Sequence, residues 1–303
     1  MATIINSGYC PTNNNEVIGT GLQHCPVNIQ DIRTIGLVKR GTDFGTSDNP
    51  DDMNLAYEQQ LQVDGKLIIL NGIFDVVDNG AEDSTEQNPS TGLTKSTLKN
   101  PYSYTINFEN DLAFNKALNY LDSYDQWDIV MWDREGNKFF TQSVAGLLKG
   151  LAVGRFTVGM YKLANGTTTA KQSVTFELKY RDEFDKRISW IIANELDYNA
   201  QEDLDGINQM LVDVTAPADT DTTVLFNVTD ITKGVPNVVF TASDVVVKVN
   251  GVADAGALVS NGNGSYTKTV AALSTSDVVT VQIEPKVVGS RVYQSALVST
   301  ITT

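Results

Sequence analysis

Residues 245–251, which read Val-Val-Val-Lys-Val-Asn-Gly, decide the fold of the C-terminal third of this 303-residue chain. A valine-rich run favours the extended conformation, and the Asn-Gly pair that follows it is a strong signal for a two-residue hairpin turn. Six similar runs lie around it, and seven short strands at a spacing of about 8–12 residues predict a β-sandwich. The other six runs are Thr223–Thr229, Asn237–Ala242, Ala257–Ser260, Tyr266–Val270, Val278–Ile283 and Val292–Ile301.

The composition of the chain changes near residue 213. All three tryptophans, both cysteines, the single histidine and all five methionines precede that point, whereas Val and Thr dominate the segment that follows. Residues 213–303 carry five basic and eight acidic side chains, a net charge of −3, which leaves −12 of the total of −15 to residues 1–212. We therefore predict two domains, 1–212 and 213–303, with a linker or first turn at residues 215–220.

Residues 1–212 predict a mainly β domain, a β-barrel or sandwich with one flanking helix. The helix is expected at Asp111–Leu121, because apolar residues recur there at close to 3.6-residue spacing and Asp111 can cap the first turn. Strands and hairpins surround it, so the whole chain is expected to be of the mainly β (α+β) class. The strands are expected at Leu67–Ile73 continued by Phe74–Val77, at Tyr102–Phe108, at Trp127–Trp132 paired with Asn137–Gln142, and at Arg155–Leu163 paired with Gln172–Tyr180.

A long polar stretch, Asp78–Asn100, separates two of the expected strands. It contains the turn-forming pairs Asn79-Gly80, Asn88-Pro89 and Thr91-Gly92. Loops of this length without structure of their own are uncommon inside compact domains. We expect the stretch to be disordered, to be ordered by a neighbouring subunit, or to form a two-stranded arm that reaches a neighbour.

The acidic composition restricts the partners of the chain. It holds 22 Lys and Arg against 37 Asp and Glu. Duplex nucleic acid and anionic membranes are bound by clustered basic residues, so neither is an expected partner. The longest apolar runs, such as Leu67–Leu70, are far shorter than the roughly 20 residues of a membrane span, and Met1–Tyr9 lacks the pattern of a secretion signal.

Candidate metal ligands are few, and we assign no metal site. Cys10, His24 and Cys25 are only three of the four ligands that structural zinc requires. Whether the two cysteines pair in a disulfide stays open. The acidic stretch Glu195–Asp205 lacks the spacing of an EF-hand calcium loop and is expected to be a solvated connector.

The sequence also gives no catalytic set. A histidine-based triad would depend on His24 alone. Gly19-Thr20-Gly21 lacks the residues that complete a phosphate-binding loop. Asp125 and Asp128 are paired carboxylates of the kind that glycosidases use, but their spacing fixes no geometry. We therefore expect no enzyme activity and assign no catalytic or cofactor-binding residue.

The C-terminal segment resembles the immunoglobulin-like modules of bacterial and phage proteins. The resemblance rests on Val245–Gly251, on Gly264-Ser265-Tyr266-Thr267 and on Asp277–Val281, where such modules have a valine-rich strand ending in Asn-Gly, a Gly-Ser-Tyr strand and a closing strand. It implies an immunoglobulin-like sandwich and does not indicate a ligand. The cysteine pair and buried tryptophan of antibody domains are absent from the segment, so a fibronectin-like topology fits it as well.

The order of elements in the N-terminal domain resembles that of the tail tube proteins of long-tailed bacteriophages. The resemblance rests on a strand, a long loop and a strand within Leu67–Phe108, then the helix Asp111–Leu121, then hairpins that end at Phe176–Tyr180. Proteins of that family form hexameric rings that stack into a tube, and many carry an immunoglobulin-like domain on its exterior.

This resemblance implies a structural protein of the virion tail, assembled in the host cytoplasm. Its implied partners are further copies of itself, other virion proteins, and the genomic DNA that passes through the lumen without specific binding. Two other classes fit the same features. One is a different virion component, such as a collar, head decoration or fibre protein, and the other is a non-viral surface or carbohydrate-binding protein.

Overall fold

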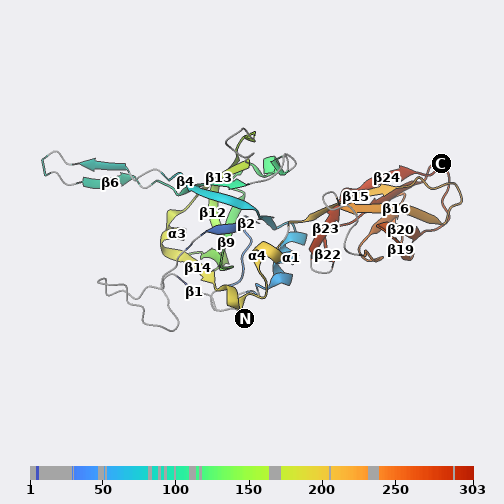
Figure 1. The fold of residues 1–303 in the computed structure, drawn as a ribbon, viewed down its shortest axis with the longest axis horizontal. Coiled ribbons are helices and arrows are strands. Elements are labelled where there is room, and N and C mark those ends of the chain that lie inside the picture. Colours follow the sequence, from blue (N-terminus) through green and yellow to red (C-terminus); the bar gives the residue numbers. More distant parts are fainter. Residues whose placement is uncertain are drawn as a thin grey trace. The chain divides into compact units, whose positions relative to one another are not determined.

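The structure of the chain is a computed structural model, and it is mainly β. The chain divides into two compact units, Met1–Glu58 with Lys66–Leu204 and Gln59–Gly65 with Asp205–Thr303 (Figure 1). Each unit is described by itself. The residues that the structure describes are 5–6, 29, 31–46, 51, 53–80, 84–87, 90–91, 94–98, 100–108, 114–115, 118–163, 172–204, 206–230, 239–288 and 291–303.

The first unit contains a twelve-stranded sheet, a separate two-stranded sheet and short helices. Its strands are β1 (Ile5–Asn6), β2 (Ile32–Lys39), β3 (Leu67–Leu70), β4 (Ile73–Asp78), β5 (Ser84–Gln87), β6 (Thr94–Leu98), β7 (Ser103–Phe108), β8 (Ser123–Tyr124), β9 (Trp127–Asp133), β10 (Lys138–Gln142), β11 (Leu148–Lys149), β12 (Leu151–Val158), β13 (Gln172–Leu178) and β14 (Ile188–Ile191). Its helices are the 3-10 helices η1 (Asn119–Leu121) and η2 (Ala193–Glu195), α3 (Arg181–Arg187) and α4 (Ala200–Asp203), and it contains the start of α1 (Leu55–Val63), whose residues from Gln59 onward belong to the second unit. No helix in these described parts is long and apolar enough to span a membrane.

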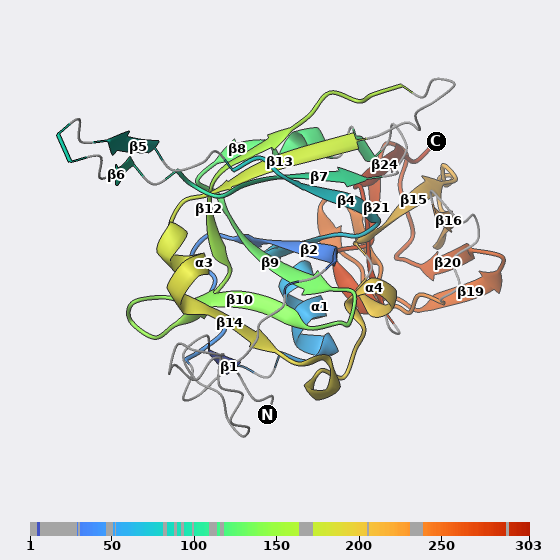
Figure 2. The ribbon, with the colours of Figure 1, turned by 60° about the vertical axis from the view of Figure 1, so that its left-hand side comes forward.

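The large sheet divides at β9. One edge of β9 pairs along its whole length with β2. The other edge pairs first with β12, through Ile129, and then with β10, through Met131. Strands β12, β13, β7 and β4 therefore form one wing, and β10, β14 and β1 form a second wing (Figure 2).

The hydrophobic core of the first unit collects side chains from both wings and from β2 and β9. Ile35, Ile129, Phe156, Phe176 and Trp190 are among its buried members. Strand β13 alternates strictly between buried and half-buried side chains, as the period of two in an extended strand requires. The sheet divides so that this core is enclosed between the wings.

Most predicted strands of the first unit are confirmed, and one is corrected. The two predicted hairpins correspond to β9–β10 and β12–β13, and Tyr102–Phe108 corresponds to β7. The single strand predicted from Leu67 to Val77 is wrong. It is two strands, β3 paired with β2 and β4 paired with β7, because Asn71-Gly72 breaks the run and Gly72 has φ +77°.

The predicted helix at Asp111–Leu121 lies partly outside the described residues, among them its proposed cap Asp111. Phe114, Asn115 and Leu118 are helical, and η1 follows them. The prediction of one helix missed α1, although Asn54 caps it by accepting a hydrogen bond of 2.9 Å from the backbone N–H of Tyr57. Helix α1 buries polar side chains, Glu58, Gln59 and Gln62, so apolar periodicity does not mark it.

The polar stretch between β4 and β7 contains a two-stranded hairpin. Strand β5 pairs with β6, from Ser84 opposite Leu98 to Gln87 opposite Thr94, in a sheet of its own. It extends beyond the ends of β4 and β7 in both views (Figures 1 and 2). Of the three forms expected for Asp78–Asn100, the structure has the two-stranded arm. We call β5 and β6 the arm.

The second unit is built from two sheets around one core. Its strands are β15 (Asn208–Val214), β16 (Thr223–Asp230), β17 (Val246–Val249), β18 (Val252–Ala253), β19 (Leu258–Gly262), β20 (Ser265–Thr269), β21 (Val278–Gln282), β22 (Lys286–Val288), β23 (Arg291–Ser295) and β24 (Val298–Ile301). One sheet has the order β19-β20-β16-β15-β23-β22 and the other β18-β17-β21-β24. Side chains of both sheets, such as Phe226 and Val281, share the core. The turn predicted at Asn250-Gly251 is confirmed, with φ +50° and +82°.

Two expectations for the second unit are corrected. Val292–Ile301 is not one strand, because the chain passes from β23 in one sheet to β24 in the other. Asn237–Ala242 is not a strand over its described part, 239–242, although Phe240 is buried in the core. The structure also adds β15, which lies between β16 and β23 and begins before the predicted boundary at 212/213.

The position of β15 predicts which fragment of the second unit folds. Residues 205–303 should unfold in one cooperative thermal transition, because they contain every strand of both sheets. A fragment of residues 215–303 should show no such transition, because it lacks a central strand that pairs with β16 on one side and β23 on the other. Calorimetry of the two fragments checks this, and equal stability would contradict the role given to β15.

Candidate functional site

The sequence assigned no site residues, and its weighed candidates do not come together. Cys10, His24 and Cys25 lie outside the described residues, as does Gly19-Thr20-Gly21. Within the described parts of 195–205, the acidic stretch contains the end of η2 and helix α4. Across all described residues, no group of three His, Cys, Asp or Glu side chains is placed to hold a metal ion.

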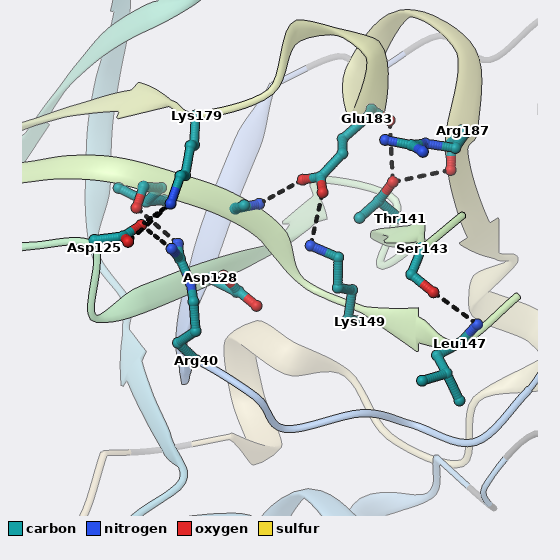
Figure 3. Close-up of polar contacts among 12 residues, drawn as sticks. Arg40, Asp125, Asp128, Thr141, Ser143, Leu147, Lys149, Lys179, Glu183 and Arg187 are labelled. Atoms are coloured by element: carbon teal, nitrogen blue, oxygen red, sulfur yellow. Dashed lines mark hydrogen bonds and ion pairs between the residues drawn. The ribbon is translucent and has the colours of Figure 1, made fainter. Parts of the chain in front are cut away.

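Charged side chains gather where the first wing leaves β9, and Figure 3 shows them. Arg40 lies directly after β2 and donates from Nε to Asp128 Oδ1 at 2.8 Å. Its Nη2 donates to the backbone oxygens of Trp127 and Val153 at 2.7 and 2.8 Å, and its Nη1 donates to Asp125. One guanidinium therefore connects β2, β9 and β12 at the point where the sheet divides.

Asp125 and Asp128 belong to this network but differ in exposure. Asp125 is exposed, and its pKa is held below the ordinary value by the hydrogen bond from Lys179 and by the charge of Arg40. Burial raises the pKa of Asp128, and the charges of Lys149 and Arg40 act in the opposite direction. Arg40 donates a hydrogen bond to each of the two carboxylates.

Helix α3 contributes the second half of the network. Glu183, the one buried residue of α3, accepts a hydrogen bond of 2.7 Å from Lys149 and one of 2.8 Å from the backbone N–H of Ala152. Thr141 donates to the backbone oxygens of Glu183 and Arg187, each at 3.1 Å (Figure 3). The helix is thereby fixed to β10 and β12, which are strands of different wings. The geometry is that of a structural clamp, which we call the branch clamp.

The branch clamp predicts the effect of replacing Arg40. An Arg40→Met variant should lose about 2–3 kcal/mol of unfolding free energy, since a buried carboxylate and two carbonyls lose a charged donor. Asp128 already has a raised pKa in the folded protein, and removing the guanidinium raises it further. Ionisation of Asp128 then opposes folding, so stability should fall as pH rises above about 4, the ordinary Asp pKa.

Urea unfolding of Arg40→Met between pH 4 and pH 8 measures this dependence. The matched control is Arg40→Met with Asp128→Asn, which has no ionisable group at residue 128. It should lack the additional loss of stability with rising pH. A single variant whose stability follows the same pH profile as the double variant would contradict the prediction.

A second polar group lies on the face of β10 that α1 covers. Lys138, at the start of β10, is fully buried and forms an ion pair with Glu58 of α1. Tyr198 donates a hydrogen bond of 3.3 Å to Glu58 Oε1. The rings of Phe44 and Trp132 lie 4.9 and 5.4 Å from Lys138 Nζ. No local sequence pattern marks this pair, because 80 residues separate its members.

The exposed surface of β4 combines apolar side chains with two carboxylates, Asp75 and Asp78. Strand β4 ends the first wing and pairs with β7 on one edge; its other edge has no strand partner among the described residues. Phe74, Val76 and Val77 of β4 are 51, 36 and 40% exposed. A cavity of about 350 Å³ lies beside this edge, lined by β4, by the start of β2 and by aromatic side chains such as Tyr104 and Phe176. An open strand edge with apolar side chains is a template for pairing with another chain.

The first unit therefore offers an internal clamp, a buried ion pair and an exposed edge that continues into the arm. Exposed apolar edges and projecting hairpins mark interaction surfaces. Of these three features, the edge of β4 and the arm are the ones exposed at the surface of the unit. No protein-family model matches the chain, and no curated protein matches it.

Proposed function

We propose that this chain is a structural protein of a bacteriophage virion, which assembles into stacked rings of a tail tube that conducts DNA. The observation that carries the proposal is the arm, a hairpin in a sheet of its own between β4 and β7. Isolated two-stranded hairpins are at best marginally stable in water. Contact with a partner surface would stabilise the arm.

The open edge of β4 supports the same function. An exposed strand edge is a template for pairing with another chain, and natural proteins protect such edges with charges, prolines or covering segments. On β4, two aspartates, Asp75 and Asp78, lie among the exposed apolar residues. Phe74 and Val77 expose apolar surface on this edge. If the edge of one copy contacts a different surface of the next copy, the contact is heterologous, and such contacts form a ring when the rotation closes.

We assign the two units to the two parts of a tail tube protein, the ring-forming domain and the exterior immunoglobulin-like domain. In the first unit, we assign the strands β2-β9-β12-β13-β7-β4 of the large sheet to the tube wall, with the arm as its contact to a neighbour. In the second unit, the two sheets around one core are assigned to an immunoglobulin-like module on the exterior. We expect this module to be dispensable for assembly.

The charge of the chain fits passage of DNA. Residues 1–212 carry a net charge of −12, the balance of 17 basic and 29 acidic residues. Carboxylates that line a channel repel phosphate, so DNA would move through it without specific binding. The proposal therefore requires an excess of acidic over basic side chains on the inner surface of the ring.

Negative-stain imaging of the purified chain tests the proposal, together with mass photometry. We expect closed rings, of six copies, that stack into tubes. Rings that do not stack would favour a collar protein. A monomer at high concentration that binds purified phage heads would favour a decoration protein, and a monomer that binds immobilised glycans would favour a surface protein. A channel lined by Lys and Arg would exclude the tube.

A further inference from the structure

The cavity of about 350 Å³ that is lined by β4 and the start of β2 has the size of a small-molecule site. Ligand pockets in proteins commonly have volumes of about 300–1,000 Å³. Four of its lining side chains are aromatic, namely Phe74, Tyr104, Phe176 and Phe184. Two of its described lining residues are aspartates, Asp31 and Asp75, and none is a Lys or an Arg. Aromatic walls combined with carboxylates favour cations over neutral molecules and anions.

The aromatic rings at the cavity form one connected cluster. The ring centroid of Tyr104 lies 5.6 Å from that of Phe176, and Tyr102 lies 6.2 Å from Tyr104. Tyr102 also lies 5.1 Å from Phe184. Its ring already holds a cation, because the guanidinium carbon of Arg181 lies 5.0 Å from its centroid. The faces of aromatic rings attract cations at such distances, so the rings that line the cavity can hold a second one.

The two aspartates differ in whether their charge is already neutralised. Asp31 forms an ion pair of 2.7 Å with Arg33, and Arg134 lies 3.8 Å from the same carboxylate oxygen. Asp75 is exposed and forms no hydrogen bond or ion pair with any described residue. The carboxylate of Asp75 is therefore available to a positively charged ligand.

The ionisation of Tyr104 is influenced by further negative charge beside the cavity. Asp78 lies opposite Tyr104 in the pairing of β4 with β7. Burial and the charges of Asp78 and Asp185 raise the pKa of Tyr104 to about 12. A nearby negative charge has this effect because it opposes formation of the phenolate. The same charges favour a cation in the cavity.

We propose that this cavity binds a small organic cation, in which an ammonium group is attached to an aromatic or aliphatic body. The body contacts buried apolar side chains such as Ile106, Met131 and Phe176, and the ammonium group lies at the carboxylate of Asp75. A metal ion is not the expected ligand, because no group of three acidic, His or Cys side chains among the described residues is placed to hold one. The proposal does not rest on the assembly function, since all of these residues belong to one copy of the chain.

Three probes that share a phenyl ring test the proposal on the full-length protein. Benzyltrimethylammonium is a cation, benzyl alcohol is neutral and benzenesulfonate is an anion. Ligand-observed NMR titrations measure their binding. We expect a dissociation constant of about 1–10 mM for the cation, at least about 5-fold lower than that for benzyl alcohol, and no saturable binding of the anion. Added salt should weaken binding of the cation and leave that of benzyl alcohol unchanged.

Two neighbouring valines of β4 locate the binding site. Val76 lines the cavity and is 36% exposed, whereas Val77 is 40% exposed and is not among the lining residues. Successive side chains of a strand point to opposite faces, so Val76→Phe adds bulk at the cavity and Val77→Phe adds it on the other face. The first should abolish binding of benzyltrimethylammonium, and the second should leave its dissociation constant unchanged.

Asp75→Asn tests the contribution of charge. It should weaken binding of the cation by about 3-fold, as expected for an exposed ion pair, and leave benzyl alcohol unaffected. Asp213→Asn removes an exposed carboxylate from the second unit and is the matched control. Circular dichroism verifies that the variants fold, and the Asp75 comparison stands if Val76→Phe does not. Equal affinities for the cation and benzyl alcohol, equal effects of the two asparagine variants, or no saturable binding of the cation would each overturn the proposal.

Discussion

A Lys138→Met variant is expected to lose about 3–5 kcal/mol of unfolding free energy, because it leaves Glu58 as an unpaired charge in the interior. The methionine keeps most of the aliphatic stem, so lost packing contributes little. Chemical denaturation followed by tryptophan fluorescence measures the effect, since Trp132 lies against residue 138. The loss is a large fraction of the roughly 5–15 kcal/mol that typically separates folded from unfolded domains.

Two variants show that the loss comes from the buried charge. Lys138→Met with Glu58→Gln should recover much of the stability, because glutamine is uncharged and keeps an oxygen for the Tyr198 hydroxyl. Lys186→Met removes one partner of an exposed pair in α3, whose side chains are 70 and 64% exposed. It should change stability by less than about 1 kcal/mol. A Lys138→Met variant as stable as Lys186→Met would contradict the account of the pair.

Removal of the arm should strongly weaken self-association and leave the first unit folded. In a chain that lacks residues 81–99, β4 and β7 can still pair, because their register ends with Asp78 opposite Tyr104 and Asn79 donates to the backbone oxygen of Ser103. The missing residues contribute no strand to the large sheet. We expect self-association to weaken by at least about 100-fold, which corresponds to roughly 3 kcal/mol.

Sedimentation velocity over a concentration series measures this change, and thermal unfolding verifies that the shortened chain folds. A matched pair of point variants distinguishes disruption of the β4 edge from the effect of adding a negative charge to any exposed strand. Val77→Asp and Val278→Asp each place a carboxylate at a valine that is 40% exposed, the first on β4 and the second in the second unit. The first should weaken association and the second should not. Unchanged assembly without the arm would remove the main support for the proposed function.

The elements that sequence patterns predicted well are those with local signals. Strand β16 alternates buried and exposed residues along its whole length, and the turn at Asn250-Gly251 adopts the positive φ values that its residues favour. The break at Asn71-Gly72 carried the same kind of signal, but the apolar residues on both sides of it concealed the change of partner strand. An unbroken run of apolar residues can therefore contain two strands that pair with different partners.

The candidate sites depend on contacts that no local pattern contains. Arg40 reaches Asp128 across 88 residues, and Lys138 reaches Glu58 across 80. Hydrophobic pattern analysis also assigns Lys and Glu to the surface, so it does not predict charged side chains that are buried. The arm was foreseeable because an excess of polar, turn-forming residues between two good strands is itself a local signal.

The parallel pairing of β15 with β23 has a consequence for the order of folding during synthesis. Asn208 pairs with Tyr293, so the first strand of the second unit needs a partner that the ribosome adds 85 residues later. Until then, β15 can pair only with β16, and the six-stranded sheet lacks β22 and β23. Contacts between distant residues slow folding. The second unit is therefore expected to stay open on the nascent chain and to close only after residue 293 has left the ribosomal tunnel.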